Sequence, residues 1–496
     1  MGLAPFFFRT YMAVGAHAGI TRDQLETILS EQLVEVKVGE RCVDEGNEKW
    51  IAELLVNLLA RLYPVLCITG PEGPGNNLRK LARAINPEIE FDDSVGKTTV
   101  SVSIGAEECA ENGFFASAGG WVARIGKDPA NILSDAPANP YSSGAAAALA
   151  AWRVFDLIVM RKDPDTLQDV SLSLLDFSAD AGASADIPCV HLGEVAVVGI
   201  GAVGNPAVWA WRRHQGLTGL LHLIDPEGVD LSNLQRYVLP HYKDHGQSKA
   251  QLAKREFLGT ALSVEAWECA LEDFADRYAG ISTLPTICVS VDNATDRRAA
   301  QALLPRLIVN GWTSDGGLGS SWHRFSGDTS CLGCLYHPYG TRASQTEIAA
   351  KALGLPHLQL ANLWVTEEGL GAAEIKVIEE HLHLNGKLED WVGKRVHDVY
   401  TGVICGQIGI DLKSIGQIAT VPLAHQSVLA GVLMAAELVK RSDETLESMS
   451  QTQPLVKWDQ ILAGLPVTWT AMRKAVPGCF CSDEHYQRIY EEKWNG

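Results

Sequence analysis

Apolar and polar positions follow the same order at two places in the chain. Residues 65–69 (VLCIT) precede the turn GPEGPG and then NNLRKLARAI, whereas residues 195–198 (VAVV) precede GIGAVG and then NPAVWAWRRH. Short apolar runs bounded by glycine are typical of buried strands, and the stretch after each turn can be helical. Both places therefore predict a strand–turn–helix unit of an α/β fold.

A further repeat lies near the end of each half, where a proline precedes a stretch of small residues. These stretches are 139–155 (NPYSSGAAAALAAWRVF) and 421–441 (VPLAHQSVLAGVLMAAELVKR). Small residues at helical spacing permit close packing, so either stretch could simply be a core helix. Their parallel placement favours two halves of one kind, joined by a linker rich in Ala, Asp and Ser at 175–188.

Length and charge narrow the class of protein. A chain of 496 residues has room for about three domains of ~150 residues each. The net charge of −19, without a Lys/Arg-rich cluster, argues against binding to nucleic acid. The two longest apolar stretches, 144–160 and 421–439, are interrupted by charged and polar residues, so we expect no membrane span. The first residues show no targeting signal, and we expect a cytoplasmic protein.

The turn after residues 195–198 has the spacing G-x-G-x-x-G. Gly199, Gly201 and Gly204 let the backbone approach a phosphate, and the following helix would direct unpaired N–H groups toward it. The spacing alone is also compatible with an ordinary glycine-rich turn. It indicates a phosphate group and does not distinguish NAD from ATP. In the first half, Gly70, Gly73 and Gly75 do not reproduce this spacing, which predicts a nucleotide fold without a nucleotide.

The residues after the glycine turn favour ATP. Asp225 ends the next strand, 21 residues past Gly204, where a carboxylate can bind a ribose hydroxyl. Arg236 and Lys249 follow, and Asp292 ends a third strand. Attack of a carboxylate on an α-phosphate requires cations to hold the triphosphate and a carboxylate to hold Mg²⁺, whereas hydride transfer does not.

These motifs resemble the ThiF/MoeB/HesA and ubiquitin-activating superfamily of ATP-dependent adenylating enzymes. The matching segments occur in order over about 140 residues. They are GIGAVGN, LIDPEGVDLSNLQRY, GQSKA, VDNATDRR and SCLGCLYHP, and the likeness returns in VPLAHQSVLAGVLMAAELVK. Two positions depart from the family pattern: Gln235 stands where Asn is usual, and Tyr237 stands where Gln is usual.

The resemblance implies adenylation of a C-terminal carboxylate, usually that of a diglycine tail on a ubiquitin-like or sulfur-carrier protein. By analogy, Asp225 binds the ribose, Asn233, Arg236 and Lys249 bind the phosphates, and Asp292 binds Mg²⁺. The family works as dimers or tandem copies in which an arginine of one copy reaches the site of the other. Arg9 is placed in the sequence like that arginine, although it could equally be a solvated residue near the terminus.

The implied architecture is two tandem Rossmann-like ThiF-type domains, the first degenerate and the second active, with a helical insertion and a zinc-clipped C-terminal tail. A homodimer through the first domain is compatible with it. The expected divisions are 1–165 (inactive adenylation-like domain), 166–190 (linker), 191–345 (ATP-binding part of the active domain), 346–415 (helical insertion and crossover segment) and 416–496 (remainder of the active domain).

Four cysteines form two close pairs, Cys331/Cys334 in C-x-x-C and Cys479/Cys481 in C-x-C. Four thiolates can form a closed tetrahedral zinc site of the structural kind. Such a site would clip the C-terminal tail to the active domain. A redox dithiol at Cys331/Cys334 or free core thiols are the alternatives, because the family's usual second pair is C-x-x-C.

Cys405 lies after the helical insertion, in the segment where thioester-forming relatives carry their reactive cysteine. A thiolate at this position could attack the acyl adenylate and release AMP. The resemblance therefore implies a ubiquitin-like activating enzyme that passes its cargo to a conjugating (E2-like) enzyme, of the type found in bacterial ubiquitin-like conjugation operons associated with phage defence. Cys405 could instead be a buried core cysteine. The alternatives are then a sulfur-carrier or cofactor-pathway adenylyltransferase without a thioester step, or a partner-binding pseudo-enzyme.

Overall fold

The computed structural model describes most of the 496 residues. The described ranges are 2–93, 98–129, 132–133, 136–166, 168–314, 317–337, 345–366, 368–382, 388–404, 422–450, 455–459 and 467–495. The chain divides into a larger unit, residues 1–7, 22–337 and 422–496, and a smaller unit, residues 8–21 and 338–421. Each unit has its own core.

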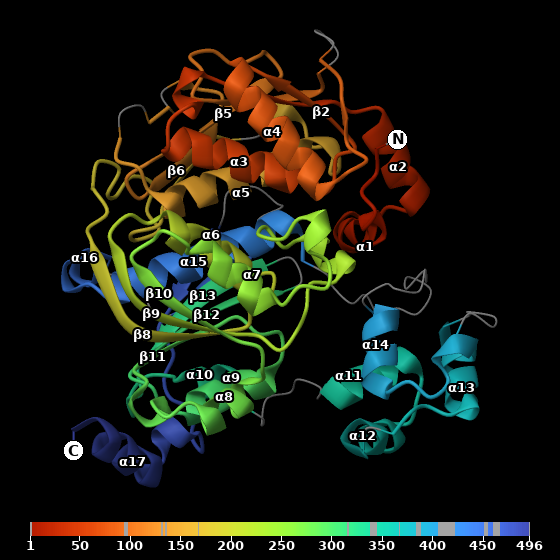
Figure 1. Ribbon diagram of the computed structural model, residues 1–496, viewed down its shortest axis with the longest axis vertical. Helices are drawn as coiled ribbons and strands as arrows, with labels where there is room; N and C mark the ends of the chain where they lie inside the picture. The colour runs from red at the N-terminus through yellow and green to blue at the C-terminus, as the bar shows by residue number, and fades with distance from the viewer. Residues whose placement is uncertain are drawn as a thin grey trace. The chain divides into compact units, whose positions relative to one another are not determined.

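Two sheets organise the larger unit (Figure 1). The first has the order β3-β2-β1-β4-β5-β6-β7 and the second has the order β10-β9-β8-β11-β12-β13-β14-β15. In sequence order, the strands of the first sheet are Val34–Val38, Val65–Thr69, Glu90–Phe91, Val100–Ile104, Gly113–Gly119, Val122–Gly126 and Val170–Ser173. Those of the second are Val190–Val198, Leu217–Ile224, Leu262–Trp267, Thr286–Val289, Leu307–Ser314, Gly317–His323, Leu455–Asp459 and Val467–Ala471.

The two sheets repeat one topology. In the first, β3-β2-β1-β4-β5 are parallel neighbours and β6 and β7 continue antiparallel. In the second, β10-β9-β8-β11-β12 are parallel neighbours and β13, β14 and β15 continue antiparallel. Parallel neighbours need crossover connections, which are usually helices, and their carboxyl ends meet at one edge. The predicted α/β fold with two Rossmann-like sheets is confirmed.

The helices of the larger unit lie mostly between its strands in the chain. In the first half they are α2 (Arg22–Ser30), α3 (Asn47–Leu59), α4 (Glu72–Ile85) and α5 (Pro140–Ile158). In the second half they are α6 (Gly204–Arg213), α7 (Lys249–Glu256), α8 (Leu271–Arg277), α9 (Ala294–Ala302), α10 (Leu332–Leu335), α15 (Ala424–Arg441), α16 (Glu444–Ser450) and α17 (Glu484–Asn495). The strand–turn–helix unit predicted from residue 65 onward is β2–α4, and the unit predicted from residue 195 onward is β8–α6.

The two small-residue helices, α5 and α15, pack against each other between the sheets (Figure 1). Helix α5 begins at Asn139, whose side-chain Oδ1 accepts a hydrogen bond from the Tyr141 N–H at 2.8 Å. A Cβ on Gly144 would lie 2.8 Å from Cγ2 of Val432, so the small residue is what permits this close approach. Both stretches are therefore core helices, and they join the two halves into one unit.

Strand β7 (Val170–Ser173) lies inside the range expected as a linker. It pairs antiparallel with β6 and completes the first sheet, because alternate residues of 170–173 fill the buried face. Only residues 174–189 connect the two sheets without a strand or helix. Four residues of the range 166–190, expected as the linker, thus belong to the first sheet, whereas the Ala-, Asp- and Ser-rich stretch 175–188 lies within the connection.

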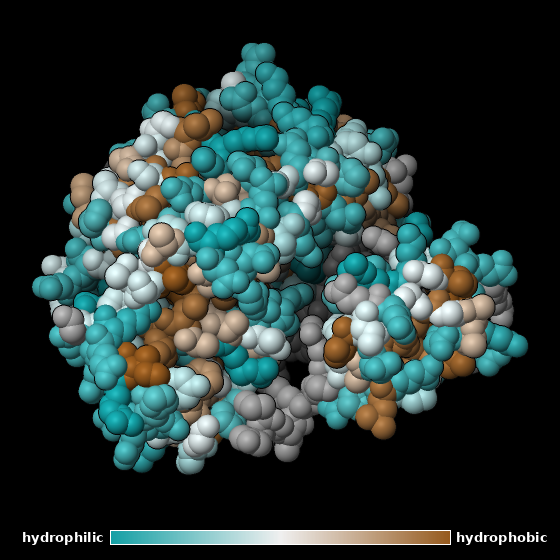
Figure 2. Space-filling model, turned by 60° about the horizontal axis from the view of Figure 1, so that its bottom comes forward, coloured by the Kyte–Doolittle hydropathy of each residue, from teal (hydrophilic) through white to brown (hydrophobic). Residues whose placement is uncertain are grey.

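The smaller unit contains α11 (Gln345–Leu353), α12 (His357–Thr366), α13 (Ala372–Leu382) and α14 (Val396–Ile404). These helices share an apolar core that includes Leu353, Leu360 and Ile378. Helix α1 spans Phe7–Ala18. The surface drawn in Figure 2 is largely hydrophilic, with apolar side chains in separate patches. Among the described residues, no helix combines the length and the apolar content needed to cross a membrane.

Candidate functional site

The glycine turn connects β8 to α6 and requires glycine for two different reasons. Gly199 has φ of +89°, a conformation that residues with a side chain rarely adopt. Gly204 is at the start of α6, where a Cβ would lie 2.2 Å from the Gly199 carbonyl oxygen. The Ser290 hydroxyl, at the end of neighbouring β11, donates to the same carbonyl oxygen at 2.6 Å. The turn is therefore tightly closed, and Gly199, Gly201 and Ala202 within it are partly exposed.

Asp225 joins the glycine turn to the end of β9. Its Oδ2 accepts a hydrogen bond from the Ile200 N–H at 2.7 Å, and its Oδ1 accepts one from the Glu227 N–H at 2.9 Å. Burial raises the pKa of Asp225, and the nearby ammonium of Lys249 and these two N–H groups partly oppose the rise. The predicted ribose residue is thus placed beside the predicted phosphate turn, as expected when neighbouring parallel strands end at one edge.

Lys249 begins α7 and is buried. Its Nζ bonds to the Glu227 carboxylate and lies 3.3 Å from the Tyr237 hydroxyl oxygen. Burial disfavours the charged amine, but Tyr237 and the carboxylates of Asp225 and Glu227 outweigh it and raise the pKa of Lys249. Lys249 is therefore a permanent cation at neutral pH, held next to the aspartate that closes the glycine turn.

Asn233 and Arg236 lie on the short segment between β9 and α7. The Asn233 Oδ1 accepts from the Asp230 N–H at 3.0 Å, which closes the start of a 3-10 turn over residues Leu231–Gln235. The Arg236 N–H donates to the Asn233 carbonyl at 3.0 Å. Tyr237 follows, and its hydroxyl lies 3.3 Å from the point where a Cβ on Gly201 would stand. The segment therefore runs beside the glycine turn.

Asp292 lies two residues beyond Ser290, in the loop between β11 and α9, and is exposed. The loop is anchored by Arg297, which is buried and donates to the Val291 carbonyl and to the Asn310 side chain. The Asn293 side chain caps α9 by accepting from the Asp296 N–H at 2.8 Å. An exposed carboxylate on a fixed loop is accessible to a hydrated cation.

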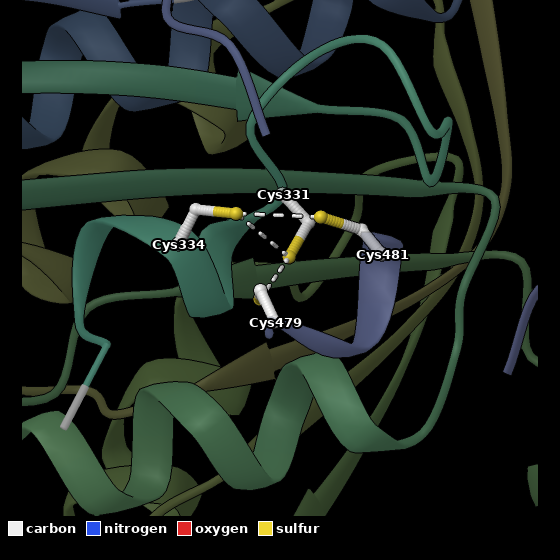
Figure 3. Close-up of side chains that lie close together, drawn as sticks. All are labelled: Cys331, Cys334, Cys479 and Cys481. Carbon is white, nitrogen blue, oxygen red and sulfur yellow. Dashed lines mark hydrogen bonds between the residues drawn. The ribbon is translucent and has the colours of Figure 1, made fainter. Parts of the chain in front are cut away.

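The structure brings the four cysteines into one buried cluster (Figure 3). Their Sγ atoms all lie within 4.8 Å of one another, with Cys331–Cys334 at 3.9 Å, Cys331–Cys479 at 3.6 Å and Cys334–Cys481 at 3.3 Å. Four sulfurs bound at about 2.3 Å to a tetrahedral zinc ion would be about 3.8 Å apart. The donors fit zinc, and the C-x-C spacing reaches the cluster through the short turn at Phe480–Ser482.

Two candidate residues cannot be placed. Cys405 lies outside the described residues, and the side chain of Arg9, on α1, is not described. The structure does describe the three cysteines of the first half, Cys42, Cys67 and Cys109. Burial raises the pKa of Cys42 to about 12 and that of Cys67 to about 11, and it also raises the pKa of Cys109. Such thiols are poor nucleophiles at neutral pH.

Several contributors to the site were not singled out from the sequence. Glu227 stands inside the motif LIDPEGVDLSNLQRY and Ser290 directly precedes VDNATDRR, so these positions were the available signal. From the first half, Arg61 contacts Leu234 and Asn57 contacts Val238, and the motifs give no indication of either contact.

Comparison with known proteins agrees with this geometry. Residues 190–475, more than half of the chain, match the ThiF family model. The chain belongs to the ThiF family. It is therefore a ThiF-type adenylyltransferase, as the motifs predicted. Residues 39–160 match a different family model, described as prokaryotic E2 family C.

One relative spans the whole chain. The uncharacterized protein y4jF of Sinorhizobium fredii is 33% identical over 526 residues, which cover 100% of this chain and 98% of that protein. Among solved structures, E. coli MccB with MccA-N7isoASN gives a TM-score of 0.34 at 16% identity, over 59% of this chain and 67% of that one. E. coli MccB with ATP gives 0.33 at 16% identity, over 58% and 67%.

Proposed function

We propose that this ThiF family member uses MgATP to adenylate the C-terminal glycine of a ubiquitin-like protein and then takes the cargo onto Cys405 as a thioester. The observation that carries the first step is the meeting of the glycine turn, Asp225 and buried Lys249 at the carboxyl edge of the second sheet. The family membership and the order of the motifs support it.

The first step joins the cargo carboxylate to the α-phosphate of ATP. A carboxylate oxygen attacks the α-phosphorus, the bond to the bridging oxygen of the β-phosphate breaks, and pyrophosphate leaves. Lys249 and Arg236 offset the negative charge of the triphosphate, and Asn233 donates to it. Asp225 binds the ribose. Asp292 is the exposed carboxylate that would hold Mg²⁺, and the ion would supply charge shielding for the leaving pyrophosphate.

The second step uses the thiolate of Cys405. The sulfur attacks the acyl carbon of the adenylate, the bond to the phosphate oxygen breaks, and AMP leaves. The proposal rests on the position of Cys405 after the helical insertion. The three cysteines of the first half are disfavoured for this role because their pKa values are raised.

We further propose a structural zinc ion in the four-cysteine cluster and a conjugating enzyme as the next acceptor. Zinc would connect the N-cap and body of α10 to the C-terminal tail through Cys331, Cys334, Cys479 and Cys481. The match of residues 39–160 to a prokaryotic E2 family supports a link between this chain and ubiquitin-like conjugation. The repeated strand order supports the interpretation of the first half as an inactive adenylation-like domain.

The test is mass spectrometry of the full chain incubated with MgATP and a candidate ubiquitin-like protein ending in glycine. The proposal expects pyrophosphate release and an adduct with the mass of the cargo less one water, removed by a thiol reductant and absent in Cys405→Ala. Cys189→Ala, at an exposed cysteine, is the matched control and should retain the adduct. AMP-linked cargo without an adduct would instead establish an adenylyltransferase of the sulfur-carrier type, and the absence of adenylate with every glycine-ended cargo would overturn both steps.

A further inference from the structure

Arg61 is a buried arginine of the first half that contacts the phosphate-binding segment of the second half. It follows α3, and its side chain is 1% exposed. One guanidinium nitrogen donates to the main-chain carbonyl of Leu234, which immediately follows Asn233. Burial lowers the pKa of Arg61 to about 9, so the side chain still carries its proton and donates at neutral pH.

Asn57 forms a second contact one turn earlier on α3. Its Oδ1 accepts from Nε and from a terminal nitrogen of Arg61 at 3.1 and 2.8 Å, which fixes the direction of the guanidinium. Its Nδ2 donates to the carbonyl of Val238 at 3.0 Å. The two residues thus hold the backbone on both sides of Arg236, at Leu234 and at Val238.

The same segment is held from within the second half. The Asn205 side chain, on α6, donates to the Ile200 carbonyl at 2.6 Å and accepts from the Leu239 N–H at 3.1 Å. The segment 234–239 therefore lies between the helix that follows the glycine turn and α3 of the first half. A buried or charged donor that loses its carbonyl partner costs free energy. These contacts therefore restrict where the segment can lie.

We propose that Arg61 and Asn57 are positioning residues, through which the first half fixes the backbone that presents Asn233 and Arg236 to the triphosphate of ATP. The inference rests on the proposed function. Both residues act on this segment through main-chain carbonyl oxygens, those of Val238 and Leu234. The first half, whose own glycine turn lacks the phosphate-binding spacing, thereby contributes to the active site of the second.

The proposal predicts that a change at Arg61 weakens binding of the phosphates of ATP and leaves binding of the nucleoside almost unchanged. Arg236 belongs to the segment 234–239 and Asn233 directly precedes it, whereas Asp225 is held by Ile200 and Glu227. Arg61→Met should therefore weaken MgATP binding about tenfold, the equivalent of one or two lost hydrogen bonds, and change adenosine binding by less than about twofold. Arg61→Lys, which keeps one donor, should recover part of the loss.

Two measurements on the full chain test this. Calorimetric titration with MgATP and with adenosine gives the selectivity, and amide hydrogen exchange without ligand reports directly on residues 234–239, which should exchange faster in Arg61→Met. Arg153→Met is the matched control, because Arg153 is a buried arginine of the first half that donates to a main-chain carbonyl, that of Gln168. It should lower stability without altering the ratio of the two affinities.

Asn57→Asp gives an independent variant if Arg61→Met does not fold. It keeps the acceptor for Arg61 and replaces the donor to Val238 with a second acceptor, so the same selective loss is expected. Equal weakening of MgATP and adenosine, or unchanged exchange at 234–239, would overturn the positioning role while leaving the proposed function intact. A wild-type chain that binds no MgATP would overturn the proposed function and this inference with it.

Discussion

The ammonium nitrogen of Lys249 lies 3.3 Å from the hydroxyl oxygen of Tyr237 and 5.2 Å from the centre of its ring. Tyr237 occupies a position where relatives usually have glutamine, and here it provides both a polar atom and an aromatic face to the buried cation. Glu227 is the other partner of Lys249 and is 70% exposed. The lysine is thus fixed on its buried side by Tyr237 and neutralised on its solvent side by Glu227.

Replacing Lys249 should weaken MgATP binding while the protein still folds. Lys249→Met keeps most of the buried aliphatic volume and removes the cation, while the exposed Glu227 can be solvated by water. Loss of a charged hydrogen bond to phosphate corresponds to about 10- to 100-fold weaker MgATP binding. Titration calorimetry would measure it, with the melting temperature as the folding control.

Lys254→Met is the comparison variant for this prediction. Lys254 lies on the same helix, α7, and is exposed, so its loss changes net charge equally without touching the site. If the two variants bound MgATP equally well, Lys249 would not be a phosphate ligand.

The glycine turn predicts a sharp contrast between two Gly→Ala substitutions. In Gly204→Ala the Cβ would meet the Gly199 carbonyl oxygen at 2.2 Å, so the turn between β8 and α6 must open. In Gly73→Ala, in the first turn of α4 in the first half, a Cβ meets nothing within 4 Å. Gly204→Ala should lose MgATP binding and cost about 1–3 kcal/mol of unfolding free energy, whereas Gly73→Ala should change neither. Retained nucleotide binding in Gly204→Ala, measured by calorimetry, would contradict the close packing of this turn.

The local parts of this site could be predicted from the sequence because each depends on a short pattern. The apolar run of β8, the glycine spacing and Asp225 at a strand end lie within about 30 residues, and parallel strand order brings them to one edge. The cysteine pairs could also be predicted from the sequence, because C-x-x-C already places two sulfurs on one side of a turn.

The remaining parts depend on packing between distant segments. Arg61 contacts Leu234 across 173 residues, and β13 (Gly317–His323) pairs with β14 (Leu455–Asp459) across the helical insertion. Strand β7 was missed because its four residues stand beside a stretch rich in Ala, Asp and Ser, and only the edge of β6 gives them a partner. The position of α3 against the second half, which brings Asn57 to Val238, has no local signal.

Asp156 should make stability depend on pH. This carboxyl is buried in α5, with its Oδ2 at 2.7 Å from Nζ of Lys162, and burial raises its pKa to about 6. A carboxyl whose pKa is higher in the folded than in the unfolded chain stabilises the fold below pH about 4, and this stabilisation disappears as the pH rises through about 6. The difference corresponds to at most about 3 kcal/mol of unfolding free energy.

Asp156→Asn isolates that contribution, because the amide does not titrate. Urea unfolding of both proteins between pH 4 and pH 7 should show wild type losing stability relative to the variant as pH rises. Asp163→Asn, at an exposed position nearby, should follow wild type throughout. Parallel profiles for wild type and Asp156→Asn would show that the buried carboxyl does not titrate in this range.

The cysteine cluster predicts one zinc ion per chain that holds the C-terminal tail. Helix α17 is otherwise attached to the rest of the larger unit through a few bonds, such as Lys493 Nζ to the Leu303 carbonyl at 2.7 Å, and none of its residues is buried. Removing zinc with a chelator, or replacing Cys479 with serine, should therefore make the tail the first site of protease cleavage while the two sheets remain folded. Elemental analysis measures the zinc, and limited proteolysis with mass spectrometry locates the cut.

Cys189→Ser, at an exposed cysteine outside the cluster, is the control and should keep both the zinc and the resistance of the tail to protease. Full zinc content in Cys479→Ser would contradict a four-thiolate site, and a peptide containing both Cys331 and Cys334 with a mass lower by two hydrogens without reductant would identify these two as a disulfide instead.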